Sequence, residues 1–330
     1  MSFLSKNIEQ VCTEIVNGNR KTLAKAITLI ESNKSEDRIF AHKILNKLNT
    51  NKNKSDSVRI AITGIPGAGK STFIDSLGNY LLNDKHKIAV LAIDPSSRIS
   101  KGSILGDKTR MSKLSNDPNV FIRPTAASNF QGGIAKNTRE SIFLCEAAGF
   151  NIIFIETVGV GQNEISVFEM VDFFLLLKIA GSGDELQGIK RGIIEMSDLI
   201  VINKTDGDNI NKSIIAKNEF QMALKLFSKK ESEWIPEVMN CSSIENNGII
   251  EIWDKISSYF KLTKANDYFY KNRIKQNKYW LREIINQSII DNFYLNERVR
   301  KEYENQLKKI NENKVDVFEA YQKIILSQKT

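Results

Sequence analysis

The sequence predicts an α/β protein built around a mostly parallel sheet, with helical extensions before and after it. Three observations lead to this prediction. Between residues 58 and 262, short β-branched runs alternate with stretches of helical periodicity. A glycine-rich turn follows the first of these runs directly, and strand-like runs stop after residue 262. Near-continuous apolar strands that alternate with helices are typical of a parallel sheet covered on both faces.

Residues 1–55 are expected to form an N-terminal helical extension. Helical periodicity is clearest in residues 20–31 and 38–48, and Ser35 stands where a helix cap is needed. The polar stretch 49–57 leads into the first strand. We find no motif for chemistry in this part of the chain.

Residues 56–262 are expected to form the sheet domain. Ligands of such sheets bind beyond the carboxyl ends of the strands, and the motifs below follow strand ends. The expected strands are 58–63, 88–93, 120–124, 152–155, 173–177, 199–202 and 236–240. The expected helices between them are 71–82, 134–148, 187–196, 214–227 and 249–259.

Residues 263–330 are expected to form a C-terminal helical arm. Two long helices are predicted, over 268–293 and 297–326, and both carry stripes of aromatic and aliphatic residues. Such a stripe on terminal helices needs a burial partner, either the core or a second copy of the chain. Residues 261–330 also hold 15 Lys and Arg against 9 Asp and Glu, which is most of the net charge of +8.

The glycine-rich turn is Gly64-Ile-Pro-Gly-Ala-Gly-Lys-Ser-Thr72, which has the G-x-x-x-x-G-K-[ST] pattern of a phosphate-binding loop. Its glycines permit a tight turn that points amide N–H groups at a polyphosphate, and the following helix N-terminus adds a positive dipole. Lys70 would place its charge on the β- and γ-phosphates, and Ser71 its hydroxyl on the Mg²⁺ between them. The expected phosphate-binding residues are Gly64, Gly67, Ala68, Gly69, Lys70, Ser71 and Thr72.

Three carboxylates are candidates for Mg²⁺, which prefers oxygen ligands held directly or through water. Asp94 closes the run that starts at Ile88, and Glu156 closes the run that starts at Ile152. Asp107 lies in the stretch Gly102-Ser-Ile-Leu-Gly-Asp. An acid at a strand end beside a phosphate loop is a common way to hold this ion, so the expected metal residues are Ser71, Asp94, Asp107 and Glu156.

The stretch Asn203-Lys-Thr-Asp206 has the N-K-x-D form of guanine-reading loops and follows an apolar strand. Asp206 can accept hydrogen bonds from the ring N–H and the exocyclic amine of guanine, whereas adenine would leave the carboxylate unpaired. After the last strand, Cys241-Ser-Ser-Ile244 stands where a backbone N–H would reach guanine O6. The expected base-binding residues are therefore Asn203, Lys204, Asp206, Ser242, Ser243 and Ile244.

Two further loops resemble nucleotide switches. Glu156-Thr-Val-Gly159 stands in the place of D-x-x-G, and the Gly159 amide could sense the γ-phosphate. Gln162 comes two residues later than the glutamine that orients water in Ras-like enzymes, so we expect slow unassisted hydrolysis. The glycine-rich, charged loop from Gly181 to Lys190 lies between a strand and a helix and is suited to movement.

The bulk composition argues against several classes of protein. Three widely spaced cysteines provide neither a disulfide framework nor a metal clip, and two isolated histidines argue against a zinc or nickel site. The positive charge is spread thinly and accompanies no nucleic-acid motif. We find no signal peptide and no run long enough to span a bilayer, and therefore expect a cytoplasmic protein without nucleic-acid or membrane partners.

These motifs together resemble the MeaB/ArgK family of GTPases, which are metallochaperone-like partners of adenosylcobalamin-dependent methylmalonyl-CoA mutase and related acyl-CoA mutases. The likeness covers nearly the whole chain. ETVGVGQ combined with GDELQGIK is the most specific part, while Lys178 stands where a proline is often seen and Ser243 where alanine is common. The matching stretches are 64–72, 92–97, 102–111, 123–133, 156–164, 183–192, 203–206 and 241–243.

The resemblance implies a P-loop G domain of the signal-recognition-particle/MinD-like class over residues 56–262, with residues 263–330 as a dimerisation arm. It assigns Mg²⁺ and phosphate to Lys70 and Ser71, and metal and water positioning to Asp94, Asp107 and Glu156. It places Lys190 in a third switch that transmits the nucleotide state to the mutase. The catalytic set implied in this way is Lys70, Asp94, Asp107, Glu156 and Lys190.

The leading hypothesis is a Mg²⁺-dependent GTPase that converts GTP to GDP and phosphate and acts as a homodimeric chaperone of an acyl-CoA mutase, gating cofactor loading and protection. The alternative is a kinase or ATPase that serves the transport of lysine, arginine and ornithine, although no phosphoacceptor signature is found. A nickel-insertion GTPase and a nucleic-acid-associated GTPase have less support from the residues present.

Overall fold

The computed structural model describes residues 3–5, 7–32, 34–50, 56–94, 111–126, 131–157, 163–181 and 191–328. The chain divides into two compact units, Met1–Ile274 and Lys275–Thr330. The first unit contains the sheet and the N-terminal helices, and the second contains most of the C-terminal helices. The three-part division expected at residues 55 and 262 stays a prediction.

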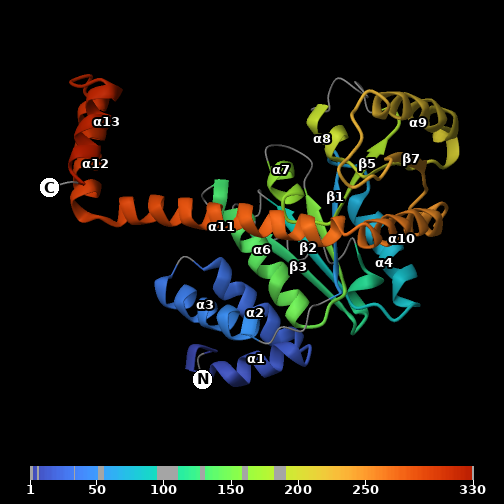
Figure 1. Cartoon of the computed structure of the whole chain (residues 1–330), viewed down its shortest axis with the longest axis horizontal. Helices are drawn as coiled ribbons and strands as arrows, with labels where there is room; N and C mark the ends of the chain where they lie inside the picture. Colours follow the sequence, from blue (N-terminus) through green and yellow to red (C-terminus); the bar gives the residue numbers. More distant parts are fainter. Residues whose placement is uncertain are drawn as a thin grey trace. The chain divides into compact units, whose positions relative to one another are not determined.

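The described strands form a seven-stranded parallel sheet with the order β3-β2-β4-β1-β5-β6-β7 (Figure 1). All seven strands expected from apolar runs are present, and the α/β prediction is confirmed. Most extend by one or two residues beyond the expected carboxyl end. The strands are β1 (Val58–Thr63), β2 (Ile88–Asp94), β3 (Val120–Ala126), β4 (Ile152–Thr157), β5 (Phe173–Ile179), β6 (Leu199–Asn203) and β7 (Glu237–Asn240).

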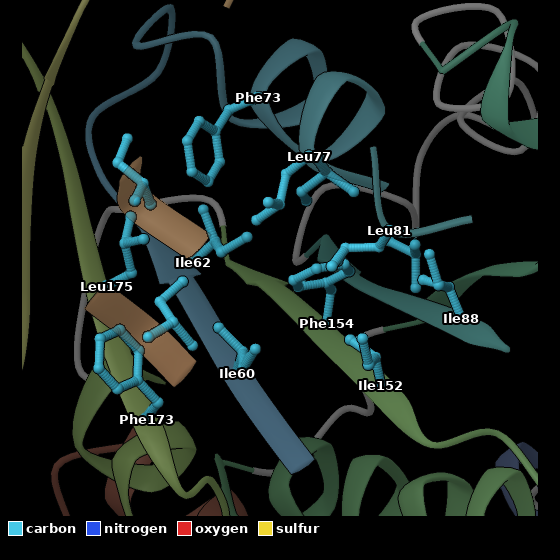
Figure 2. Packing of buried hydrophobic residues seen from close by; sticks show 14 of the residues in the cluster. Ile60, Ile62, Phe73, Leu77, Leu81, Ile88, Ile152, Phe154, Phe173 and Leu175 are labelled. Atoms are coloured by element: carbon cyan, nitrogen blue, oxygen red, sulfur yellow. The ribbon is translucent and has the colours of Figure 1, made fainter. Parts of the chain in front are cut away.

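One face of the sheet is covered by α4 (Lys70–Leu82) and α10 (Ile249–Ala265). Figure 2 shows how Phe73, Leu77 and Leu81 of α4 point at strand residues such as Ile62 and Phe154. Every one of these side chains is fully buried. The close packing fixes α4, and with it the turn that joins β1 to α4.

The opposite face is covered by α6 (Gln131–Ala147), α7 (Asn163–Phe168), α8 (Arg191–Met196) and α9 (Ile210–Leu224). Because alternate strand residues point to opposite faces, Phe173 and Leu175 join the α4 side while Phe174 and Leu176 join this one. The N-terminal helices pack on α6, and they are α1 (Ile8–Val16), α2 (Arg20–Glu31) and α3 (Ser35–Thr50).

At the amino ends of the strands, two ion pairs tie the sheet to its flanking helices. Arg59 of β1 donates to both carboxylate oxygens of Glu146 on α6, at 2.8 and 2.9 Å. Arg273, in the first turns of α11 (Tyr268–Leu295), donates to both oxygens of Asp172, at 2.9 and 2.7 Å, and to the carbonyl of Ser57 at 2.7 Å. These contacts anchor the start of β1 at the end remote from its glycine-rich turn.

We expect Glu146→Gln to destabilise the protein by about 3 kcal/mol, because it leaves the Arg59 charge without its buried partner. Burial alone would raise the pKa of Glu146, but the charges and hydrogen bonds of Arg59, with Arg273 and Ser57, hold it below the ordinary value of 4.5. Because the pKa of Glu146 is lower in the folded state, its ionised carboxylate stabilises the fold at pH values above its pKa in the unfolded chain. This contribution is lost as the pH falls through the pKa of the folded state.

The measurement is the free energy of unfolding in urea at several pH values. The difference between wild type and Glu146→Gln should narrow as the pH falls below 4.5. Glu36→Gln, at an exposed position of α3, is the matched control and should follow the wild type. A constant difference at every pH would contradict the assigned role of the carboxylate.

The second unit contains the rest of α11, together with α12 (Glu297–Asn311) and α13 (Val317–Leu326). A continuous helix over 297–326 was the wrong prediction, because the chain turns at Asn313, whose φ is +54°. Asp316 then caps α13 by accepting from the amides of Phe318 and Glu319, at 2.8 and 2.9 Å. Val299 and Gln306 of α12 and Ala320 of α13 are buried, and the two helices pack against each other.

No helix in the described part of the chain is both long and apolar enough to cross a membrane.

Candidate nucleotide-binding site

The turn between β1 and α4 has the backbone conformation of a phosphate-binding loop. Gly64 has φ of +149°, and a Cβ there would lie 2.0 Å from the Leu177 carbonyl oxygen. Gly69 has φ of +89°, and a Cβ there would lie 2.7 Å from Nδ2 of Asn203. Glycine is therefore required at both positions. A Cβ would collide with its neighbours, and residues that carry a Cβ rarely adopt φ values in this range.

The start of α4 supplies the other features of this loop. Phe73 makes the first intrahelical hydrogen bond of α4, to the Gly69 carbonyl at 2.8 Å, so the preceding amides have no intrahelical acceptor. Lys70 Nζ donates to the carbonyl oxygens of Gly64 and Ile65, at 2.7 and 3.1 Å. The Lys70 side chain therefore folds back over the glycine-rich turn.

Two of the predicted metal residues lie side by side. Ser71 Oγ, at the first turn of α4, donates to Glu156 Oε1 of β4 at 2.9 Å. The backbone of Asp94 ends β2, which pairs with β4, so it lies at the same edge of the sheet. The Asp94 side chain and all of Asp107 lie outside the described residues.

A buried pair of threonines joins the ends of β1 and β4. Thr157 Oγ1 donates to Thr63 Oγ1 at 2.8 Å, and both residues are almost fully buried. Thr63 directly precedes the glycine-rich turn and Thr157 directly follows Glu156. The sequence gives no sign of this pair, because Thr63 precedes the phosphate-loop pattern and Thr157 occupies a variable position of the stretch 156–159.

Asn203, at the end of β6, connects the stretch that is predicted to read the base to the glycine-rich turn. Its Nδ2 donates to the Ala68 carbonyl at 2.9 Å. Its Oδ1 accepts from Ser243 N at 3.2 Å, Ser243 Oγ at 2.8 Å and Cys241 Sγ at 3.3 Å. Burial raises the pKa of the Cys241 thiol to about 12, so this group stays protonated and able to donate.

Asp206 and the stretch after β7 are held together by a second set of bonds. Ser242 Oγ donates to Asp206 Oδ2, and Thr205 N donates to the Cys241 carbonyl at 3.1 Å. Ser76 Oγ of α4 donates to the Ser243 carbonyl, a contact that no sequence pattern indicated. The two stretches that are predicted to read the base are therefore bound both to each other and to α4.

The remaining predicted residues are placed less centrally or lie outside the described part. Lys204 has φ of +59°, and its Cε lies 3.9 Å from the position of a Cβ on Gly69, so its stem runs beside the phosphate loop. Gly67 and Ala68 lie within that loop, while Thr72 and Ile244 are exposed. Gly159 and Lys190 lie outside the described residues.

Residues 23–298 match the family model described as methylmalonyl Co-A mutase-associated GTPase MeaB. The chain belongs to the MeaB family. Membership confirms the predicted P-loop fold and shows that the protein is a GTPase that binds guanine nucleotides.

Relatives of this MeaB-family chain extend over most of its length. It is 42% identical over 296 residues to the GTPase ArgK of Escherichia coli, covering 90% of this chain and 89% of that protein. It is 42% identical over 303 residues to the mouse mitochondrial methylmalonic aciduria type A homolog, covering 89% and 73%. A probable GTPase of Mycobacterium tuberculosis is 41% identical over 294 residues, covering 89% and 87%.

The MeaB-family fold also has a close match among solved structures. The crystal structure of a protein titled LAO/AO transport system kinase superposes with a TM-score of 0.75 at 33% identity, covering 98% of both chains. Because it covers 98% of both chains, the match includes the N-terminal and C-terminal helices as well as the sheet.

Proposed function

We propose that this GTPase is a Mg²⁺-dependent G-protein chaperone of an adenosylcobalamin-dependent acyl-CoA mutase of the methylmalonyl-CoA mutase type, working in the cytoplasm. Its GTP or GDP state would gate loading and protection of the mutase cofactor. The observation that carries the proposal is the match of residues 23–298 to a family described as mutase-associated. The name of the mouse relative, a methylmalonic aciduria type A homolog, supports the same role because it also refers to methylmalonic acid.

Guanine would be read by Asp206 and by the residues that orient it. The carboxylate of Asp206 accepts from the ring N–H and the exocyclic amine, while Ser242 holds one of its oxygens in place. Asn203, Lys204, Ser243 and the exposed Ile244 complete the base site in this proposal. Support comes from the bonds of Asn203 to both Ala68 and Ser243, which tie base recognition to the phosphate loop.

Ser243→Ala should weaken binding of GDP and GTP by about 2–10-fold, the usual effect of losing one intramolecular hydrogen bond. The hydroxyl donates to Asn203 Oδ1 at 2.8 Å and is nearly buried, so it fixes the amide that reaches the phosphate loop. Binding is measured by calorimetry. The control is Ser258→Ala, because the exposed Ser258 hydroxyl bonds to a backbone carbonyl of its own helix. Equal nucleotide affinities of the two variants would contradict the role of Ser243.

The phosphates and Mg²⁺ would be held by the loop and by the carboxylates at the strand ends. Lys70 and the amides from Gly64 to Thr72 bind the phosphates, and Gly159 senses the γ-phosphate. Ser71 Oγ and Glu156 Oε1 fit a magnesium site, since their separation of 2.9 Å matches adjacent oxygen ligands around Mg²⁺, about 2.9 Å apart at Mg–O distances of about 2.0–2.1 Å. Asp94 and Asp107 would complete the set of ligands and position water.

The reaction in this proposal is transfer of the γ-phosphoryl group from GTP to water, giving GDP and phosphate. Bound Mg²⁺ would neutralise charge on the phosphate oxygens. Lys70 adds a positive charge at the same group, the strand-end acids orient the attacking water, and Lys190 carries the nucleotide state to the mutase. Catalysis is then mainly positioning and charge stabilisation.

The C-terminal helices support the proposal of a homodimer. Large apolar side chains are exposed on α11, α12 and α13, and Phe318 is 82% exposed. Exposed apolar surface of this extent is typical of an interface. The exposed set in the second unit includes Leu281, Ile285, Ile289, Leu295, Leu307, Val317, Phe318, Tyr321 and Leu326.

A kinase acting in amino-acid transport is the second candidate, because one similar structure carries that title. Such an enzyme would transfer the γ-phosphoryl group to a protein or amino acid, whereas a GTPase releases it as phosphate. Labelled GTP distinguishes the two, because label on an added transport protein would favour the kinase and free labelled phosphate the GTPase.

The proposed role is tested by mixing the purified protein with cofactor-free methylmalonyl-CoA mutase and adenosylcobalamin. We expect a complex on gel filtration, and formation of active mutase that differs between GTP, a non-hydrolysable GTP analogue and GDP. Cofactor loading that is the same with and without this protein, in every nucleotide state, would contradict the proposal.

A further inference from the structure

One helix of the first unit presents an unusual apolar surface to solvent. Ile210, Ile214, Ile215 and Met222 of α9 are 49–69% exposed, and Leu226 on the turn that follows is 78% exposed. We call these five residues the α9 face. Among the side chains that the structure describes, no other helix lying wholly within the first unit exposes more than one large apolar residue.

The α9 face is not the side that holds the helix on the sheet. Ala216, Phe220 and Leu224 point the other way and are buried against β5, β6 and β7. The helix is therefore apolar on both sides, although Figure 1 shows it at the outer end of the sheet, beside β7. Clustered apolar side chains that are exposed to solvent and accompanied by polar ones are typical of interaction sites, so the exposed side of α9 indicates a partner.

We propose that the α9 face is the docking surface for an acidic, apolar patch on the acyl-CoA mutase, an inference that rests on the proposed function. The positive charge of this region favours an acidic surface as the occupant. From Ile210 to Lys229 the chain holds four lysines and a single acid, Glu219. A second copy of the same face would bring these lysines together, and the C-terminal residues 261–330 of this chain are themselves basic.

A protein surface fits the α9 face better than a lipid surface. The aromatic side chains of this region, Phe220 and Phe227, are at least partly buried in the core rather than exposed. Asn211 and Asn218 lie exposed between the apolar side chains, and would enter the acyl region if the face were inserted into a bilayer. At a protein interface, such amides can form hydrogen bonds across the contact.

The position of the α9 face would couple docking to the nucleotide. The helix begins directly after the turn Gly207–Asn209, which follows Asp206. In its first turn, Lys212 Cδ lies 3.8 Å from the position of a Cβ on Gly181, at the end of β5. A partner seated on α9 thus contacts the helix that continues the base-reading stretch, and its binding should alter the rate of GDP release.

The test uses the full-length protein and purified methylmalonyl-CoA mutase, with affinity measured by calorimetry. The triple variant Ile215→Gln, Met222→Gln and Leu226→Gln should bind the mutase about tenfold or more weakly, as expected for loss of central apolar anchors. Its helical content and intrinsic GTP hydrolysis should equal those of the wild type. The matched control changes Val16, Ile39 and Ile250, which are exposed on three other helices, to glutamine.

A second pair of variants tests the charge. Lys217→Glu with Lys225→Glu should weaken binding and reduce its dependence on salt, whereas Lys43→Glu on α3 should not. Unchanged or tighter binding by the first pair would overturn the assignment of an acidic partner.

The outcomes separate the inference from the proposed function. Wild-type binding that only the α9 triple variant loses would support the docking surface. Wild-type binding that the triple variant keeps would overturn the surface alone. Failure of the wild type to bind the mutase would overturn the proposed function and this inference together. If the wild type sediments with phosphatidylserine vesicles and the triple variant does not, the α9 face binds a membrane and the inference of a protein partner is overturned.

Discussion

Lys70→Ala is expected to reduce GTP hydrolysis by about 10²–10³-fold, as for loss of one preorganised charge at a transition state. The side chain lies at the turn between β1 and α4, where it now bonds to the Gly64 and Ile65 carbonyls. In the proposed complex it would exchange these for the β- and γ-phosphates. Phosphate release from saturating GTP is the measurement, and nucleotide affinity should fall as well.

The control for this variant is Lys43→Ala, at an exposed position on α3. It should hydrolyse GTP at the wild-type rate. An unchanged rate in Lys70→Ala would show that the glycine-rich turn is not the site of hydrolysis, whatever its conformation.

Asp206→Asn should convert the nucleotide preference from GTP to XTP. The new amide can still accept from the ring N–H of guanine, but it turns an NH₂ group toward the exocyclic amine, so the two bonds to a charged acceptor are lost. This loss costs about 3–5 kcal/mol, or about 10²–10⁴-fold in affinity. Xanthine offers a carbonyl in place of the amine and can accept from the new amide. Competition between the two nucleotides for wild type and variant measures the change.

Asp208→Asn is the matched control, because this exposed acid lies only two residues further along the chain. It should keep the preference for GTP. Retained GTP selectivity in Asp206→Asn would mean that the base is read elsewhere, and that the hydrogen bond from Ser242 to Asp206 does not serve base recognition.

The sheet could be predicted from the sequence because buried parallel strands are continuous apolar runs, as in residues 152–155 of β4. Helix ends were less predictable. The stretch 297–326 has helical periodicity throughout, yet Asn313 adopts a positive φ and Asp316 caps a new helix. Asparagine and aspartate are favourable at such positions but do not dictate them, so periodicity alone did not reveal the break.

The candidate site was predictable where backbone requirements restrict the sequence. Gly64 and Gly69 are needed for steric reasons that any chain with this loop must meet. The contact of Ser76 with Ser243 could not be predicted, since it joins residues 167 positions apart and uses an ordinary serine on a helix. The same holds for Thr63 and Thr157, which the pairing of β1 with β4 brings together.

GTP turnover in the presence of the mutase is the decisive measurement of whether this GTPase acts on that partner. The rate of phosphate release by the purified protein should rise with the concentration of methylmalonyl-CoA mutase and reach a plateau at saturation. Lys70→Ala should keep both basal and stimulated turnover about 10²–10³-fold below those of the wild type. A wild-type rate that is the same at every mutase concentration would contradict the proposal that this GTPase acts on that partner.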